Sequence, residues 1–113
     1  MSDVDRLQRT YAPFYRAVQD AQNALVDNPG SEEAFDARER AIEALSEQVE
    51  STLTALVALA RETSDVAEIT RIRELSTLIN SDLDFLAETD PLLVNRFAFA
   101  RAVDEEIREL LDE

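Results

Sequence analysis

The stretch VDRLQRTYAPFYRAVQDAQNAL, residues 4–25, decides the fold class of this chain. Its apolar side chains recur at alternating intervals of three and four positions: Val4, Leu7, Tyr11, Phe14, Val18, Ala21 and Leu25. Successive residues of an α-helix are rotated by about 100°, so these side chains form one stripe while Arg16 and Asp20 fall on the opposite side. Such a stripe is the seam of a bundle or coiled coil. The sequence therefore predicts a helix over residues 3–27.

Pro13 lies inside this predicted helix, on its polar side. A proline there removes one backbone hydrogen bond and bends the helix around its packed face. Because the apolar stripe continues through the proline, we predict one helix kinked at Pro13. The alternative is a helix that begins between Thr10 and Pro13 and leaves residues 1–9 outside it.

The rest of the chain is also predicted to be helical, since Gly30 is its only glycine and neither glycine nor proline occurs between Gly30 and Pro91. Ser31 is a good cap for a second helix over 31–63, and Asp65 for a third over 65–88. Asp90 and Pro91 provide a cap and a first-turn proline for a fourth over 91–112. We expect an all-α fold with a single domain, residues 1–113, arranged as an antiparallel up-down bundle of about four helices.

On a helical wheel, the apolar side chains of the third and of the fourth predicted helix cover a wide arc. Each arc is wider than packing against one neighbouring helix requires. Either each helix packs against two neighbours within the chain, or the excess surface is buried between subunits. We favour the second explanation and predict an interface around Arg96. The favoured interpretation of Arg96 itself is a side chain that reaches solvent or forms an ion pair with Asp82 or Glu68 of its own chain, and the alternative is an ion pair with a partner's carboxylate. The predicted interface residues are Leu75, Leu78, Leu92, Arg96, Phe97, Phe99 and Val103.

The composition is strongly acidic: 25 acidic residues stand against 11 basic ones, all arginine, for a net charge of -14. This composition resembles that of proteins from salt-loving archaea, in which high salt screens the repulsion. A GC-rich bacterial genome is the alternative explanation for arginine in place of lysine. The charge is uneven, however. The first predicted helix carries three arginines against four acids, and residues 91–103 (PLLVNRFAFARAV) contain no acid, so a partner is expected at these two segments.

Several kinds of site are excluded or disfavoured. The chain has no cysteine, and therefore no thiol nucleophile and no thiolate metal ligand. It also has no histidine, which is the commonest metal ligand and general base. Glu39, Glu43, Glu47 and Glu50 have helical spacing but fall on the flank and outer side of their helix, where they would meet solvent. Arg96 and Arg101 alone cannot attract nucleic acid in such an acidic chain. We expect no catalytic residue, no cofactor, no metal and no nucleic-acid partner.

The apolar stretch at 53–60 is far shorter than a membrane span, and the first residues do not resemble a signal peptide. We therefore expect no membrane association, and a location in the cytoplasm or in a particle assembled there. The functional expectation is a non-enzymatic homo-oligomer that serves as a scaffold, an adaptor or a structural component of a larger assembly or virion. The alternatives are an acidic regulator of a basic partner, such as an antitoxin or nucleic-acid mimic, and, less favoured, an all-α Mg²⁺-dependent hydrolase.

Overall fold

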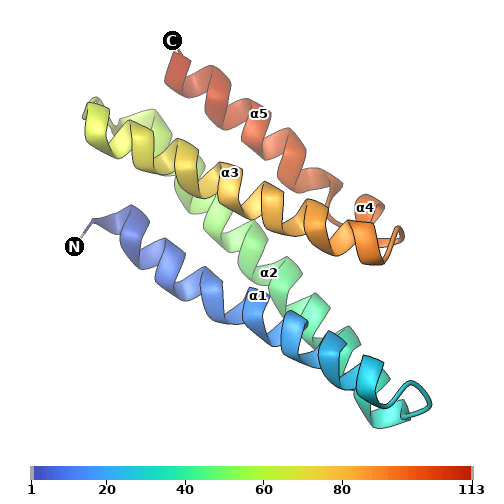
Figure 1. Cartoon of the computed structure of the whole chain (residues 1–113). Coiled ribbons are helices and arrows are strands. Elements are labelled where there is room, and N and C mark those ends of the chain that lie inside the picture. The colour runs from blue at the N-terminus through green and yellow to red at the C-terminus, as the bar shows by residue number, and fades with distance from the viewer. Residues whose placement is uncertain (1, 113) are drawn as a thin grey trace.

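The computed structural model describes residues 2–112, which form five α-helices and no strand (Figure 1). Their bounds are α1 Asp3–Asp27, α2 Glu32–Glu62, α3 Val66–Thr89, α4 Leu93–Arg96 and α5 Ala98–Asp112. The prediction of an all-α bundle is confirmed. The first three predicted helices agree with α1, α2 and α3 to within one residue at each end.

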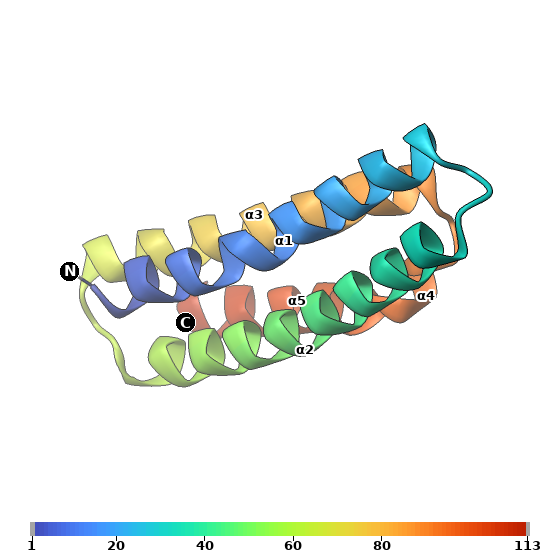
Figure 2. The same cartoon turned by 90° about the horizontal axis from the view of Figure 1, so that it is seen from below.

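The four long helices lie in two layers, with α1 beside α3 in one and α2 beside α5 in the other (Figures 1 and 2). Consecutive long helices run in opposite directions, so the two helices within each layer are parallel to each other. The α2–α3 connection crosses from one layer to the other, which leaves α1 and α5 diagonally opposed. The molecule measures 52 × 28 × 17 Å.

Side-chain caps fix the starts of the three longest helices. The Ser2 hydroxyl accepts a hydrogen bond from the Asp5 amide at 3.1 Å, and the Ser31 hydroxyl accepts one from the Ala34 amide at 3.2 Å. The Asp65 carboxylate accepts one from the Ala67 amide at 3.0 Å. Such bonds satisfy amides that lack partners in the first helical turn. Because α1 begins directly after Ser2 and is continuous through Pro13, the alternative start between Thr10 and Pro13 is wrong, whereas the kink itself stays a prediction.

The fourth predicted helix, 91–112, is corrected: α4 and α5 are separate helices that meet at Phe97. Asp90 caps the C-terminus of α3, and its carboxylate accepts a hydrogen bond from the Leu92 amide at 3.2 Å. This tether holds residues 90–92 close to α3. Phe97 has a backbone φ of -106° and ψ of 13°, and there the chain changes direction to follow the axis of α5 (Figure 1).

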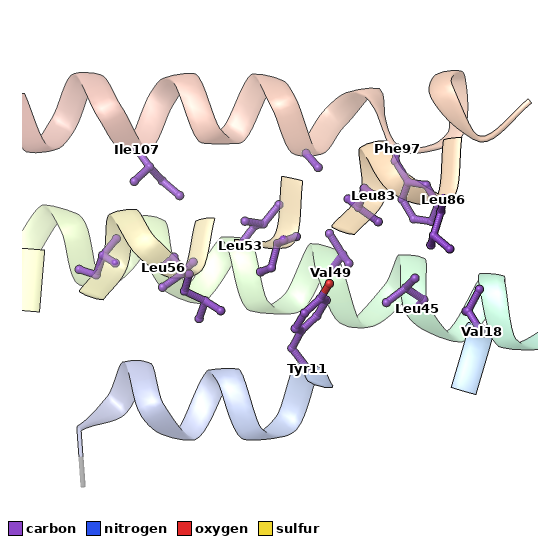
Figure 3. Packing of buried hydrophobic residues seen from close by; sticks show 14 of the residues in the cluster. Tyr11, Val18, Leu45, Val49, Leu53, Leu56, Leu83, Leu86, Phe97 and Ile107 are labelled. Carbon is purple, nitrogen blue, oxygen red and sulfur yellow. The ribbon is translucent and has the colours of Figure 1, made fainter. Parts of the chain in front are cut away.

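The buried side chains of all five helices form one core (Figure 3). The predicted seam of α1 is present, with Val4, Tyr11 and Val18 fully buried. Helix α3 packs against α1, α2, α4 and α5, and α5 packs against both α2 and α3. Neighbours within the chain therefore occupy most of the two wide arcs. Leu75 and Phe97, which we had assigned to an intersubunit surface, belong to this core.

Candidate functional site

The remaining residues of the predicted interface are spread over different parts of the surface. Leu92 is 82% exposed beside α4, and Arg96 is exposed at the end of α4. Phe99 and Val103 are partly buried against the core from α5, while Leu78 lies on α3 and is 39% exposed. Within residues 2–112 Arg96 forms no ion pair, either with Asp82 or with Glu68. The predicted residues therefore do not form a single patch.

Asp82 is instead bound to Tyr11, whose hydroxyl donates a hydrogen bond of 2.8 Å to the carboxylate. Burial raises the pKa of Asp82 above its ordinary value, and the hydrogen bond from Tyr11 opposes this shift without cancelling it. Burial is also the main cause that raises the pKa of the Tyr11 hydroxyl, with the nearby carboxylate adding to it. The Tyr11–Asp82 hydrogen bond joins α1 to α3, so a role in the packing of these two helices is enough to explain it.

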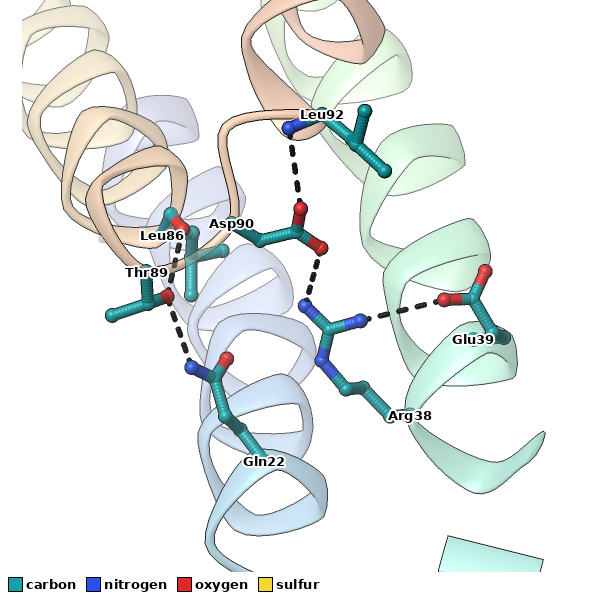
Figure 4. Close-up of polar contacts among 7 residues, drawn as sticks. All are labelled: Gln22, Arg38, Glu39, Leu86, Thr89, Asp90 and Leu92. Atoms are coloured by element: carbon teal, nitrogen blue, oxygen red, sulfur yellow. Dashed lines mark hydrogen bonds and ion pairs between the residues drawn. The ribbon is translucent and has the colours of Figure 1, made fainter. Parts of the chain in front are cut away.

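Arg38 interrupts the apolar seam predicted for the second helix, but it was not among the predicted site residues. It occupies a position in the α2 seam that should be apolar, and it is only 8% exposed. Its guanidinium donates a hydrogen bond of 2.8 Å to Asp90, and a longer contact of 3.4 Å reaches Glu39 (Figure 4). The hydrogen bond from Arg38 lowers the pKa of Asp90. Two features of the sequence indicated this pair: a charged residue in an apolar seam, and an acid, Asp90, in the connection that follows the third helix.

A small amide network lies beside the Arg38–Asp90 pair (Figure 4). The Gln22 amide donates to the Thr89 hydroxyl at 2.9 Å, and that hydroxyl donates to the Leu86 carbonyl at 2.9 Å. The side-chain oxygen of Gln22 is buried and has no hydrogen-bond partner among the described residues 2–112. These bonds, like the Arg38–Asp90 pair, hold the C-terminal end of α3 against its neighbours.

Ser76 and Asp104 form an arrangement that resembles an activated nucleophile. The Ser76 hydroxyl donates a hydrogen bond of 2.5 Å to Asp104, whose carboxylate also accepts one of 2.9 Å from Arg108. A nucleophile needs a base partner and must reach its substrate. The Ser76 side chain is fully buried, so its hydroxyl serves the α3–α5 contact instead.

The glutamates that lie at helical spacing on α2 point away from the core. Glu43, Glu47 and Glu50 are exposed, while Glu39 contacts Arg38. Within residues 2–112, no three acidic side chains converge in a way that could hold a metal ion. A hollow of about 130 Å³ lies between α3 and the α4–α5 segment, with Leu83, Leu93 and Phe97 among its lining residues.

The surface between α1 and α3 differs from the rest of the molecule. Two hollows lie along it, one near Leu78 and the other near Phe85, which is 55% exposed. The hollow near Phe85 is lined mostly by side-chain amides and a hydroxyl, with Asp20 as its acid, whereas the hollow near Leu78 carries the charged side chains of Asp5, Arg71 and Glu74. We call this surface the α1/α3 face; it comprises Asp5, Gln8, Gln19, Asp20, Gln22 and Asn23 of α1 with Arg71, Glu74, Leu78 and Phe85 of α3.

Each helix within residues 2–112 is too short or too polar to cross a bilayer. Comparison with known proteins found no matching family model, no matching curated protein and no matching solved structure. The functional assignment therefore depends on the surface and the polar contacts of the chain itself.

Proposed function

We propose that this protein works without catalysis, by binding other proteins and most directly copies of itself, as a scaffold or adaptor. The observation that carries the proposal is the α1/α3 face. Phe85 and Leu78 expose large apolar side chains there, seven residues apart on the same side of α3. Seven residues are about two helical turns, which is the spacing at which one helix meets another.

The side-chain amides of this face support self-association. Two copies that each carry a net charge of -14 repel one another, and the repulsion is strongest where acidic surfaces meet. Three of the four glutamines in the chain, Gln8, Gln19 and Gln22, lie on the α1/α3 face. Asp20 and Glu74 also line its two hollows, so a contact through this face needs salt to screen their repulsion.

The polar groups inside the bundle support a non-catalytic role. Ser76 is bound to Asp104, Tyr11 to Asp82 and Arg38 to Asp90, each in a contact between helices. Such networks fix the packing of a bundle, and each partner satisfies a group that burial would otherwise destabilise.

The test is the mass in solution of the unaltered protein, of Phe85→Glu and of Phe35→Glu, measured by light scattering in about 1 M NaCl, where charges are strongly screened. Phe35 is a matched control because it is 53% exposed, on α2. We expect an oligomer for the unaltered protein and for Phe35→Glu, and a shift toward monomer for Phe85→Glu. A monomer for all three at high micromolar concentration would contradict the proposal.

A further inference from the structure

We infer that the contact between α1 and α3 is a pH-sensitive latch, closed by the hydrogen bond from Tyr11 while the Asp82 carboxyl is protonated and loosened when that carboxyl ionises. Loosening means that α1 and α3 move apart locally while the helices themselves are retained. The latch is a property of a single copy of the chain, so it does not depend on the proposed self-association.

Asp82 lies where a negative charge is costly. Its carboxyl is half-buried at the α1–α3 contact, and Tyr11, which donates to it at 2.8 Å, is only 1% exposed and points from α1 into the bundle (Figure 3). The Tyr11 hydroxyl can donate to the carboxyl whether or not the carboxyl is protonated. Ionisation therefore keeps this hydrogen bond and adds a charge that burial disfavours.

The groups around Asp82 do not neutralise that charge. On α1, the ionisable groups beside it are the hydroxyls of Tyr11 and Tyr15, which carry no positive charge. Within residues 2–112 no ion pair includes Asp82. The arginines of α2 and α5 that bind acids of α3 or its cap are paired elsewhere, Arg38 with Asp90 and Arg101 with Asp84.

The direction of the response follows from burial. Burial raises the pKa of Asp82 above its ordinary value of 3.8, and the hydrogen bond from Tyr11 only opposes this shift. The folded state therefore holds this proton more tightly than the unfolded state. Its stabilisation of the closed contact is fully present below the ordinary pKa and is lost as the pH rises through the raised value.

The rest of the α1–α3 contact resists separation weakly. Hollows lie along it near Leu78 and near Phe85, before and after Asp82 on α3. The buried oxygen of Gln22, which has no hydrogen-bond partner among residues 2–112, gains water when the helices separate. Helix α1 also packs along α2, so it can move away from α3 and keep that second contact.

The test uses the tyrosines as probes, because the chain has two, Tyr11 and Tyr15, and no tryptophan. Near-UV circular dichroism and acrylamide quenching of tyrosine fluorescence report the contact, and far-UV circular dichroism reports the helices. Both are measured from about pH 4 to about pH 8, between the ordinary pKa values of aspartate and tyrosine. Asp82→Asn keeps an acceptor for Tyr11 but cannot ionise. Asp84→Asn is the matched control, since it changes the net charge equally at an exposed acid of α3.

At a dilution where the mass is that of the monomer, we expect the unaltered protein and Asp84→Asn to lose near-UV signal and to gain quenching as the pH rises, at constant far-UV signal. Asp82→Asn should keep the signals of the acid form throughout. A response of Asp82→Asn like that of Asp84→Asn, or no response of the unaltered protein, overturns the latch. A loss of far-UV signal in step with the tyrosine signal also overturns it, because the whole bundle would then be unfolding.

A second measurement decides the matter if Asp82→Asn does not fold. An NMR titration of the Asp82 carboxyl carbon in the unaltered protein should have the same midpoint as the change in the tyrosine signal. A different midpoint would show that another group controls the contact, and the latch would be overturned.

Discussion

Arg38 shows how one residue can contradict the pattern around it and still stabilise the fold. It lies in the apolar seam of α2, where a charge is costly unless paired. Asp90, at the end of α3, supplies the pairing carboxylate at 2.8 Å. The sequence revealed the anomaly in the seam but not its partner, because the two residues meet only once α2 and α3 are packed.

Arg38→Met should lower the free energy of unfolding by about 1–3 kcal/mol at pH 7, because it removes a hydrogen bond between charged groups in a largely buried position. Arg40→Met is the control, since Arg40 is exposed and should change stability by no more than about 0.5 kcal/mol. Urea unfolding measures both. Equal stability of the two variants would contradict the structural role of Arg38.

The same pair predicts a pH dependence. The hydrogen bond from Arg38 lowers the pKa of Asp90 below its ordinary value of 3.8, so the folded state holds the proton less tightly than the unfolded state. The stabilisation is present above about pH 4 and is lost as the pH falls through the lowered pKa. Urea unfolding at pH 7 and at pH 3 should therefore show the deficit of Arg38→Met shrinking at the lower pH, and a constant deficit would argue against this linkage.

Tyr11→Phe tests the other buried pair. It leaves the Asp82 carboxylate without its donor, which should lower the free energy of unfolding by about 1–3 kcal/mol at pH 7. The pKa of Asp82 is raised by burial, so its contribution to stability is fully present below its ordinary pKa and is lost as the pH rises through the folded-state value. Removing the donor raises that pKa further, so the deficit should be larger at pH 7 than at pH 3. A deficit that grows toward low pH would contradict this assignment.

At the scale of the helix, the periodicity of apolar residues predicted α1, α2 and α3 closely but missed the break between α4 and α5. Leu93, Phe97 and Ala100 continue the spacing of three and four residues across the break, so no pattern in the sequence marks it. Just before α4, Asp90 forms hydrogen bonds with the Leu92 amide and with Arg38 of another helix. A helical wheel describes one helix at a time and cannot include such a contact.

Because a helical wheel describes one helix at a time, it also could not distinguish an intersubunit surface from the core of the bundle. The wheel indicates that the apolar arc of α3 is wide, but it does not show which neighbouring helices cover that arc. Leu75 faces the core, whereas Leu78, three residues later, is at its exposed edge. Phe85 was counted in neither the arc nor the predicted interface, yet it is the more exposed member of the pair on the α1/α3 face.

Pro13 offers a test within α1. Pro13→Ala restores a backbone amide at an exposed position inside a continuous helix, and it should raise the free energy of unfolding, by at most about 3 kcal/mol. Pro29→Ala, in the turn before α2, should have the opposite sign and cost up to about 1 kcal/mol, because it increases the freedom of the unfolded chain. Thermal unfolding compares the two variants. A loss of stability in Pro13→Ala would contradict this expectation and would favour the predicted kink as a feature that the bundle needs.

At the scale of the whole molecule, the net charge of -14 opposes the compact state. Raising NaCl from about 0.1 M to about 1 M shortens the screening length from roughly 10 Å to 3 Å, so the free energy of unfolding should increase with salt. Urea unfolding at a protein dilution where the mass is that of the monomer separates this effect from association. Stability that falls with salt would show that ion pairs such as Arg71–Asp5 outweigh the general repulsion.

The central claim is that this acidic bundle associates with itself through the α1/α3 face. The most direct measurement is the mass of the unaltered protein by light scattering across a dilution series, at about 0.1 M and at about 1 M NaCl. We predict a discrete dimer that is populated at micromolar concentration in the higher salt and dissociates in the lower salt. A mass equal to that of one chain at every concentration and in both salts would contradict the claim.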